Sequence, residues 1–183
     1  MMKEPGDGLR LRDILRFTSL DVRMLWPDVH LLLVIGDSET SPGSDIFSLT
    51  RENRSTSAIA LGEQLVTKDM LPGAMVVPIS TKREDDLTTP VMVGRSQLAD
   101  IYINHPTVSQ RHAIIYPPQK EEDRWRIRDT SSTNGTMVGG VMLTPEAVHY
   151  LREMDDILFG ALSCRFIDTA ALAELLDWIK GLS

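Results

Sequence analysis

The feature that most constrains the fold is a series of short apolar segments between residues 74 and 168, separated by polar loops. Such segments are too short for helices and have the length that is typical of strands. Their close and regular spacing is that of a β-sandwich. The sequence therefore predicts a mainly β chain, with strands at residues 75–79, 91–93, 101–103, 112–116, 125–128, 137–138 and 162–167.

The segments on either side of this region show different patterns. Apolar residues at helical spacing predict a helix over residues 9–18, and the apolar run 30–35 predicts a buried strand. Residues 38–57 are dominated by polar residues, which predicts a flexible loop, and 58–66 fits either a strand or a short helix. A closing helix is expected after residue 168, capped by Thr169 and ended by Gly181.

These patterns divide the chain into three parts. Residues 1–73 form an N-terminal extension, 74–168 the sandwich and 169–183 a C-terminal helix. An extension of about seventy residues with one helix and one strand cannot build its own core. We therefore expect it to pack on the sandwich or to form an interface with a second copy of the chain.

Composition excludes several classes of function. The 183 residues carry a formal net charge of -7, which is not the electrostatic footprint of a nucleic-acid-binding protein. The sequence has no apolar run of membrane-spanning length and no signal-peptide pattern, so we expect no membrane contact and a cytoplasmic location. Cys164 is the only cysteine, and we expect it to be a small buried apolar residue. A cysteine-based zinc site is excluded, and we expect neither a metal nor a cofactor.

Three polar clusters follow expected strands. They are Gly94-Arg95-Ser96, the tetrapeptide 109–112 and the octapeptide 129–136. Loops that leave different strands of a sandwich converge at its ends, where binding residues collect. The sequence therefore predicts a binding site at one rim of the sandwich.

The residue types in these clusters suit the binding of an oxyanion. Gly94 permits a sharp turn, and the planar guanidinium of Arg95 can grip an oxyanion with two hydrogen bonds. The Ser109 hydroxyl is a small uncharged donor, and Gln110 and Arg111 offer amide or cationic contacts. Taken alone, the Gly94-Arg95 pair is usually no more than a solvated arginine.

Two further features have structural explanations. His112 enters an apolar strand, so we expect a buried imidazole that hydrogen-bonds neighbouring loops, not a catalytic base. The sequence Asn134-Gly135 predicts a tight turn, because these residues readily adopt positive φ. The Asn134 side chain carries a donor and an acceptor and is suited to reading a peptide main chain, although an isolated Asn-Gly is often a simple hairpin turn.

In combination and at this spacing, the motifs resemble the forkhead-associated (FHA) domain. The matching residues are Gly94-Arg95, Ser109, His112, Asn134-Gly135-Thr136 and, less strictly, Asp155-Asp156-Ile157 with Gly160. The resemblance covers roughly residues 74–168. It implies an antiparallel FHA-type β-sandwich and a non-catalytic module that recognises phosphothreonine in a partner protein, such as a Ser/Thr kinase or its substrate.

The resemblance also implies a role for each matching residue. Arg95 and Ser109 would contact the phosphate, with Gln110 and Arg111 as auxiliary contacts. Thr133 and Asn134 would meet the surroundings of the phosphate and the peptide main chain. The shape of the loops would depend on Gly94, His112, Gly135 and Thr136. The chain departs from the family at Gln110, where Arg or Lys is frequent, and at Gly139-Gly140, where an Asn is frequent.

Three alternatives remain at this point. Gly36-Asp37-Ser38 resembles the first block of GDS-type esterases, although the Asp-x-x-His those enzymes also need is missing. The residue types of Ser109, His112 and Asp129 would allow a catalytic triad, but no oxyanion motif accompanies them. An FHA-like adaptor that acts independently of phosphate is the third alternative.

Threonines in the polar N-terminal loop suggest a further hypothesis. A loop phosphorylated at Thr40 or Thr50 would supply a ligand to the site of the same chain or of a second copy.

Overall fold

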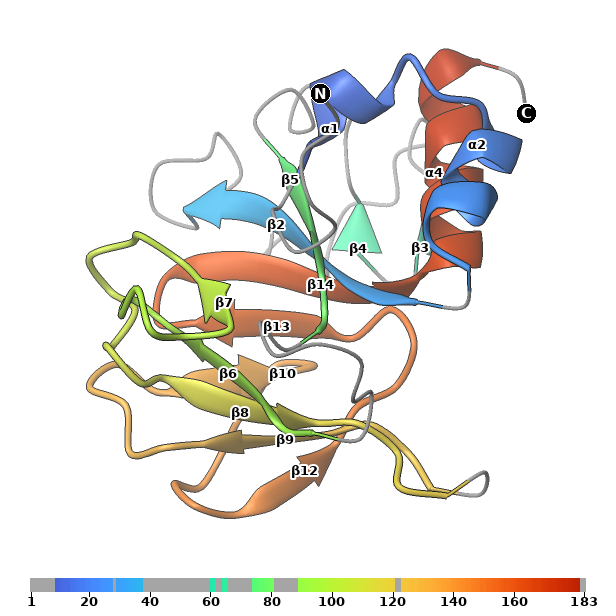
Figure 1. Cartoon of the computed structure of the whole chain (residues 1–183). Coiled ribbons are helices and arrows are strands. Elements are labelled where there is room, and N and C mark those ends of the chain that lie inside the picture. Colours follow the sequence, from blue (N-terminus) through green and yellow to red (C-terminus); the bar gives the residue numbers. More distant parts are fainter. Residues whose placement is uncertain are drawn as a thin grey trace.

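The structure is a computed structural model that describes residues 9–27, 29–37, 60–61, 64–65, 74–80, 89–120 and 123–181. Two β-sheets pack face to face, and helices gather at one end of them (Figure 1). The prediction of a mainly β sandwich with a C-terminal helix is therefore confirmed. The N-terminal loop 38–57, with Ser38, Thr40 and Thr50, lies outside the described residues, as does residue 28.

The larger sheet has seven strands in the order β1-β5-β2-β14-β13-β10-β11, and every pairing in it is antiparallel. Its strands are β1 (Leu9–Arg10), β5 (Met75–Pro78), β2 (His30–Asp37), β14 (Leu162–Asp168), β13 (Asp156–Phe159), β10 (Thr136–Val138) and β11 (Val141–Met142). Strand β2 lies between β5 and β14, so this sheet joins segments from both sides of residue 74. The strand predicted at residues 30–35 is thus present and extends to Asp37.

The smaller sheet has five strands in the order β12-β9-β8-β6-β7. They are β12 (Val148–Tyr150), β9 (Arg126–Asp129), β8 (Ala113–Tyr116), β6 (Val91–Gly94) and β7 (Ile101–Tyr102). Its pairings are antiparallel except for β6 and β7, which run parallel. The ambiguous segment at residues 58–66 contains a two-stranded ladder of β3 (Ala60–Leu61) and β4 (Gln64–Leu65).

The main core lies between the two sheets. Alternate residues of β8 and β9 point inward, as the two-residue repeat of a strand requires. Val93, Ile115, Ile127 and Phe159 are among the residues buried there. Cys164 is also buried in this core, as the sequence predicted, and burial raises the pKa of its thiol.

The prediction of one helix over residues 9–18 is wrong. The chain forms β1, then α1 (Leu11–Ile14), and then a separate helix α2 (Ser19–Leu25). Thr18 starts the second helix, because its hydroxyl accepts a hydrogen bond from Asp21 N at 3.1 Å while the Asp21 carboxylate accepts from Thr18 N at 2.8 Å. This capping box fixes Thr18 in an extended conformation, which separates the two helices.

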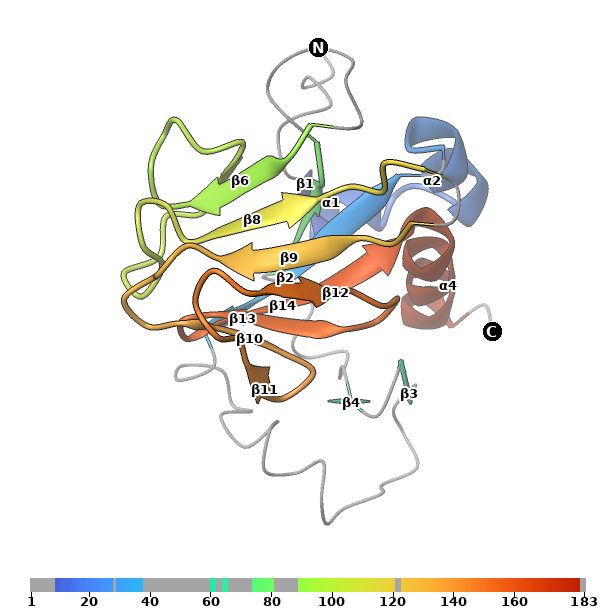
Figure 2. The ribbon, with the colours of Figure 1, turned by 90° about the horizontal axis from the view of Figure 1, so that it is seen from below.

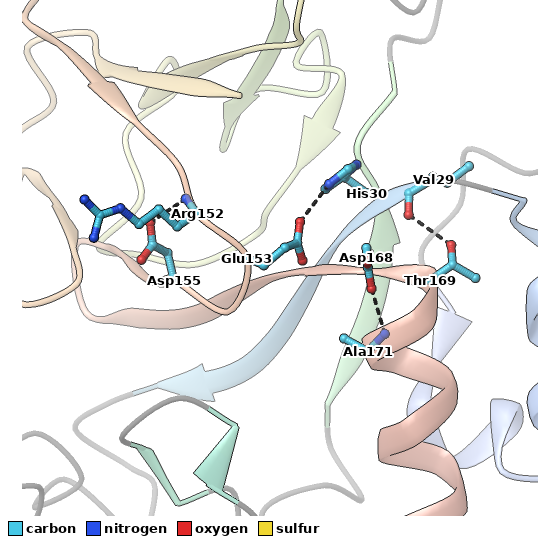
Figure 3. Close-up of polar contacts among 8 residues, drawn as sticks. All are labelled: Val29, His30, Arg152, Glu153, Asp155, Asp168, Thr169 and Ala171. Atoms are coloured by element: carbon cyan, nitrogen blue, oxygen red, sulfur yellow. Dashed lines mark hydrogen bonds and ion pairs between the residues drawn. The ribbon is translucent and has the colours of Figure 1, made fainter. Parts of the chain in front are cut away.

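The closing helix α4 (Thr169–Lys180) begins one residue earlier than its predicted cap implies. Asp168 is the cap, since its carboxylate accepts a hydrogen bond from Ala171 N at 2.7 Å. The hydroxyl of Thr169 instead contacts the carbonyl oxygen of Trp26 at 2.6 Å. It also contacts the carbonyl oxygen of Val29 at 3.0 Å (Figure 3). Gly181 ends the helix with a φ of 72°, as predicted.

A second apolar cluster joins the helices to the sandwich. It contains Leu11, Ile14, Val22, Trp26, Ala74, Val76, Ile167, Leu172, Leu175 and Leu176. A 2.7 Å contact between Nε2 of His30 in β2 and the Glu153 carboxylate of the β12–β13 loop also ties the N-terminal segment to the sandwich (Figure 3). The described N-terminal residues therefore pack on the sandwich. None of the described helices is long and apolar enough to cross a bilayer.

Candidate functional site at the loop rim

The polar clusters lie at the end of the sandwich away from helices α2 and α4 (Figure 2). The loops β6–β7, β7–β8 and β9–β10 meet there with the turn between β13 and β14. Strands β9 and β10 belong to different sheets, so the Asn134-Gly135 turn carries the chain across the sandwich. It is not the hairpin turn that an isolated Asn-Gly suggests. Gly135 has the expected positive φ, at 76°.

Gly94 brings the first two loops together. A Cβ atom at this position would lie 2.2 Å from the carbonyl oxygen of Gln110, which is a main-chain atom that cannot turn away. The loops then pair through Arg95 N to Ser109 O at 2.9 Å and Ser96 N to Gln110 O at 3.1 Å. A glycine is needed here because of this close approach of two main chains.

Arg95 leaves β6 directly after this contact and presents an exposed guanidinium. Its Nε donates to the carbonyl oxygen of Val108 at 3.1 Å, which holds the side chain along the neighbouring loop. Within the described part of the chain, the two terminal nitrogens have no hydrogen-bond partner. The planar end of the guanidinium is therefore available to an oxyanion.

Ser109 and Thr133 join the second loop to the third. Thr133 N donates to Ser109 Oγ at 3.0 Å, and Ser109 Oγ donates to Thr133 Oγ1 at 3.3 Å. Because Ser109 O also accepts from Arg95 N, residues from three loops are linked at one place. Gln110 and Arg111 have exposed side chains on the same loop as Ser109.

His112 is fully buried behind these residues. Its Nδ1 accepts a hydrogen bond from Ser109 N at 3.0 Å, so the ring carries its proton on Nε2, which donates to Gly135 O at 3.0 Å. The ring of Phe159 packs edge-on against it, with centroids 5.5 Å apart. Burial lowers the pKa of His112, which favours the neutral imidazole.

This geometry does not assemble the triad of Ser109, His112 and Asp129. Both imidazole nitrogens of His112 bind main-chain groups, and the Ser109 hydroxyl bonds to Thr133. Asp129 instead binds Ser132 and Thr136. The imidazole therefore has no nitrogen left to take a proton from the Ser109 hydroxyl.

Asp129 supports the third loop from inside. Its buried carboxylate accepts from Ser132 N at 2.8 Å, Ser132 Oγ at 2.7 Å and Thr136 Oγ1 at 2.6 Å. Burial acts to raise the pKa of Asp129, but these hydrogen bonds outweigh it and the pKa lies below its ordinary value. The sequence did not identify this supporting role, although an Asp that bonds a main-chain N–H a few residues later is a known turn pattern.

Asn134 is exposed at the rim, and its amide nitrogen donates to the carbonyl oxygen of Thr107 at 2.8 Å. The sequence did not single out Thr107. Thr136, expected to support the site, is buried against Asp129. Among the matched residues farther along the chain, Asp156 forms an ion pair with the buried Arg165 at 2.7 Å.

The described residues contain no group of three or more His, Cys, Asp or Glu side chains placed to hold a metal ion. The site instead presents hydrogen-bond donors: the Arg95 guanidinium, the Ser109 hydroxyl and the exposed Arg111.

Comparisons with known proteins place this rim within a family. The family model described as the FHA domain matches residues 91–160. A probable serine/threonine-protein kinase of Dictyostelium discoideum is 34% identical over 88 residues, which are 42% of this chain. The chain spans only 6% of the length of that relative.

Solved structures of FHA domains are also similar to the chain. The MEK1 FHA domain in complex with a HOP1 phosphothreonine peptide is 22% identical, covers 51% of this chain and 87% of its own, and has a TM-score of 0.41. The FHA domain of the CT664 protein from Chlamydia trachomatis is 19% identical, covers 76% and 97%, and has a TM-score of 0.47. The motifs at the rim and the family match agree: residues 91–160 of this chain are a forkhead-associated domain.

Proposed function

We propose that this domain is a phosphothreonine-binding module that recruits a Ser/Thr-phosphorylated partner through the loop rim. One observation carries the proposal. The guanidinium of Arg95 is held at Nε by Val108 O, while its two terminal nitrogens have no described partner. An arginine fixed in this way has lost part of its freedom before a ligand arrives, so less entropy is lost when it binds.

The phosphate group would meet donors from two loops. Arg95 supplies a planar pair of N–H groups, and Ser109 supplies a hydroxyl that now donates to Thr133 across a long 3.3 Å contact. A phosphate oxygen is a stronger acceptor than the Thr133 hydroxyl, so the Ser109 proton would turn to the ligand. Charge-assisted hydrogen bonds of this kind contribute about 1.5–3 kcal/mol each.

The remaining site residues would have smaller effects. Arg111 adds positive charge near the phosphate, and Gln110 beside it is neutral. We propose that Thr133 contacts the surroundings of the phosphate and that Asn134 contacts the peptide main chain. The partner would be a Ser/Thr kinase or a kinase substrate. Binding requires no chemistry at the site, so we propose that the domain is not an enzyme.

A phosphopeptide library tests this proposal. The full chain would be titrated with degenerate phosphothreonine peptides, the matching phosphoserine peptides and unphosphorylated threonine peptides. We expect binding only to phosphorylated peptides, with a preference for phosphothreonine. An N-terminal fragment phosphorylated at Thr40 or Thr50 can be added as a peptide, to test whether the chain supplies its own ligand.

The matched variants are Arg95→Ala and Arg124→Ala. Arg124 is also exposed, but it precedes β9 at the other end of the strand from the rim and lies over the Tyr150 ring. Arg95→Ala should weaken phosphate-dependent binding by at least about tenfold, whereas Arg124→Ala should retain it. If the folded wild type binds no phosphopeptide, the phosphate-independent adaptor becomes the better explanation.

A further inference from the structure

We propose that Thr107 is a positioning residue that orients Asn134 for the ligand main chain and links it to the turn between β13 and β14. This inference deepens the proposed function and rests on it. Thr107 lies in the β7–β8 loop, two positions before Ser109, and touches two other loops. It is partly buried, and neither the sequence motifs nor the phosphate contacts account for it.

The main chain of Thr107 fixes the orientation of the Asn134 amide. Its carbonyl oxygen accepts from Asn134 Nδ2 at 2.8 Å. A carbonyl oxygen can only accept, so the nitrogen of the amide must face it and the oxygen must face elsewhere. Asn134 therefore offers Oδ1 at the exposed rim. Oδ1 accepts hydrogen bonds, and a main-chain N–H of a peptide is a suitable donor for it.

The side chain of Thr107 is fixed from the opposite direction. Its Oγ1 accepts from Ala161 N at 2.9 Å and lies 2.9 Å from Nδ1 of His105. The preceding residue, Gly160, packs so closely that a Cβ atom there would lie 2.5 Å from Thr107 O and 2.7 Å from Thr107 Oγ1. The turn between β13 and β14 thus packs closely against Thr107, the residue whose carbonyl oxygen orients Asn134.

These contacts predict how a change at Thr107 would act. Thr107→Val keeps the shape of the side chain but removes the acceptor for Ala161 N. The loop would shift to satisfy that partly buried N–H, and the carbonyl would lose its alignment with Asn134. Thr107→Ser keeps the hydroxyl and removes only a methyl group. It is therefore the matched conservative variant.

The first experiment is a double-mutant cycle with one phosphothreonine peptide that the wild type binds. Thr107→Val should weaken binding about fivefold, the ratio that one hydrogen bond of about 1 kcal/mol corresponds to. Thr107→Ser should stay within about twofold of the wild type. In an Asn134→Ala background, Thr107→Val should have almost no further effect on affinity, because the Asn134 amide that Thr107 orients has been removed. An equal loss in both backgrounds would overturn the proposal.

A second variant displaces Thr107 through the turn between β13 and β14. Gly160→Ala would displace Thr107 and leaves Arg95, Ser109 and Asn134 unsubstituted, and it should give the same Asn134-dependent loss of affinity. Gly160 has a φ of 62°, so the matched control is Gly181→Ala, where φ is 72° and no atom lies within 4 Å of the added Cβ. The control imposes a similar backbone strain and should leave peptide affinity unchanged.

A ligand-free measurement separates this proposal from the proposed function. In the NMR spectrum of the free protein, the Nδ2 proton of Asn134 that binds Thr107 O should be shifted downfield and should exchange slowly with solvent, compared with an exposed asparagine amide. Thr107→Val should move this signal toward that of an exposed asparagine amide and speed its exchange, and Thr107→Ser should not. If the signal does not respond to Thr107→Val, the proposal is wrong whether or not peptides bind. If the wild type binds no phosphopeptide, the peptide experiments contradict the proposed function. The NMR measurement then still decides whether Thr107 orients Asn134.

Discussion

The imidazole of His112 donates from Nε2 to the carbonyl oxygen of Gly135 at 3.0 Å, across 23 residues of sequence. Its other nitrogen accepts from Ser109 N, so one buried ring fixes the loop that carries Ser109 and the turn that carries Asn134. The bond from Ser109 N is lost if the ring is protonated on both nitrogens, because Nδ1 then carries a hydrogen and cannot accept. The shape of the rim therefore depends on a neutral histidine.

This dependence predicts a loss of stability in mild acid. Burial lowers the pKa of His112, so near pH 6 the unfolded chain binds a proton that the folded chain does not accept. The free energy of unfolding should fall as the pH drops below about 6.5, by at most about 1.4 kcal/mol per pH unit from this group. Urea denaturation at pH 7.5, 6.5 and 5.5 measures the slope.

The control for this prediction is His112→Asn, which keeps a polar side chain but cannot titrate. The other histidines are present in both proteins, so their contributions cancel. The variant should be less stable at pH 7.5 and should lose less stability between pH 7.5 and 5.5. Equal slopes for the two proteins would show that His112 is not the group responsible.

Asp129 predicts a separate effect at lower pH. Its carboxylate accepts three hydrogen bonds from Ser132 and Thr136, and its pKa is held below the ordinary value. The resulting stability is present above the unfolded pKa of about 3.9 and is lost as the pH falls through the lower folded pKa. Asp129→Asn should cost about 1–3 kcal/mol at pH 7 and should flatten the stability profile below about pH 4.

The same denaturation series tests the prediction, with Asp123→Asn as the matched control. Asp123 precedes β9 at the other end of the strand from Asp129 and is only partly buried. Its replacement should change the stability at pH 7 much less. An Asp129→Asn protein as stable as the wild type would show that the hydrogen bonds to the carboxylate do not stabilise the loop.

Gly94 predicts an effect of main-chain contact on binding. In Gly94→Ala the new Cβ atom would lie 2.2 Å from Gln110 O, and the two loops would have to separate. We expect a loss of about 1–3 kcal/mol of stability, the usual range for overpacking, together with weaker phosphopeptide binding because Arg95 moves away from Ser109. Gly140→Ala, with no atom within 4 Å of its Cβ, should leave the affinity unchanged. Calorimetry with one phosphopeptide distinguishes the two variants.

Much of the sandwich could be predicted from local patterns. Apolar segments separated by polar loops located β5, β6, β8, β9 and β14 to within a residue or two. His112 was expected to be a buried residue bonded to neighbouring loops, and the structure has it so. The pattern fails where a strand is very short and exposed. β11, for example, holds only Val141 and Met142, both exposed, and no two-residue alternation can be read from it.

Other features depend on partners that are distant in the sequence. Thr169 has the residue type of a helix cap, but its hydroxyl is used by Trp26 and Val29 from another part of the chain. Thr107 gave no signal, because its contacts with Asn134 and Ala161 form only when three loops meet.

Arg95 provides the most direct test of the central claim. The affinity of one phosphothreonine peptide would be measured for the wild type, Arg95→Ala, Arg95→Lys and Arg124→Ala, with the unphosphorylated peptide alongside. We predict that Arg95→Ala weakens binding by at least about tenfold, since charge-assisted hydrogen bonds contribute about 1.5–3 kcal/mol each. Arg95→Lys should recover only part of this loss, because lysine lacks the planar fork. Arg124→Ala should bind as the wild type does. Phosphate-dependent binding that survives in Arg95→Ala would contradict this account of the site.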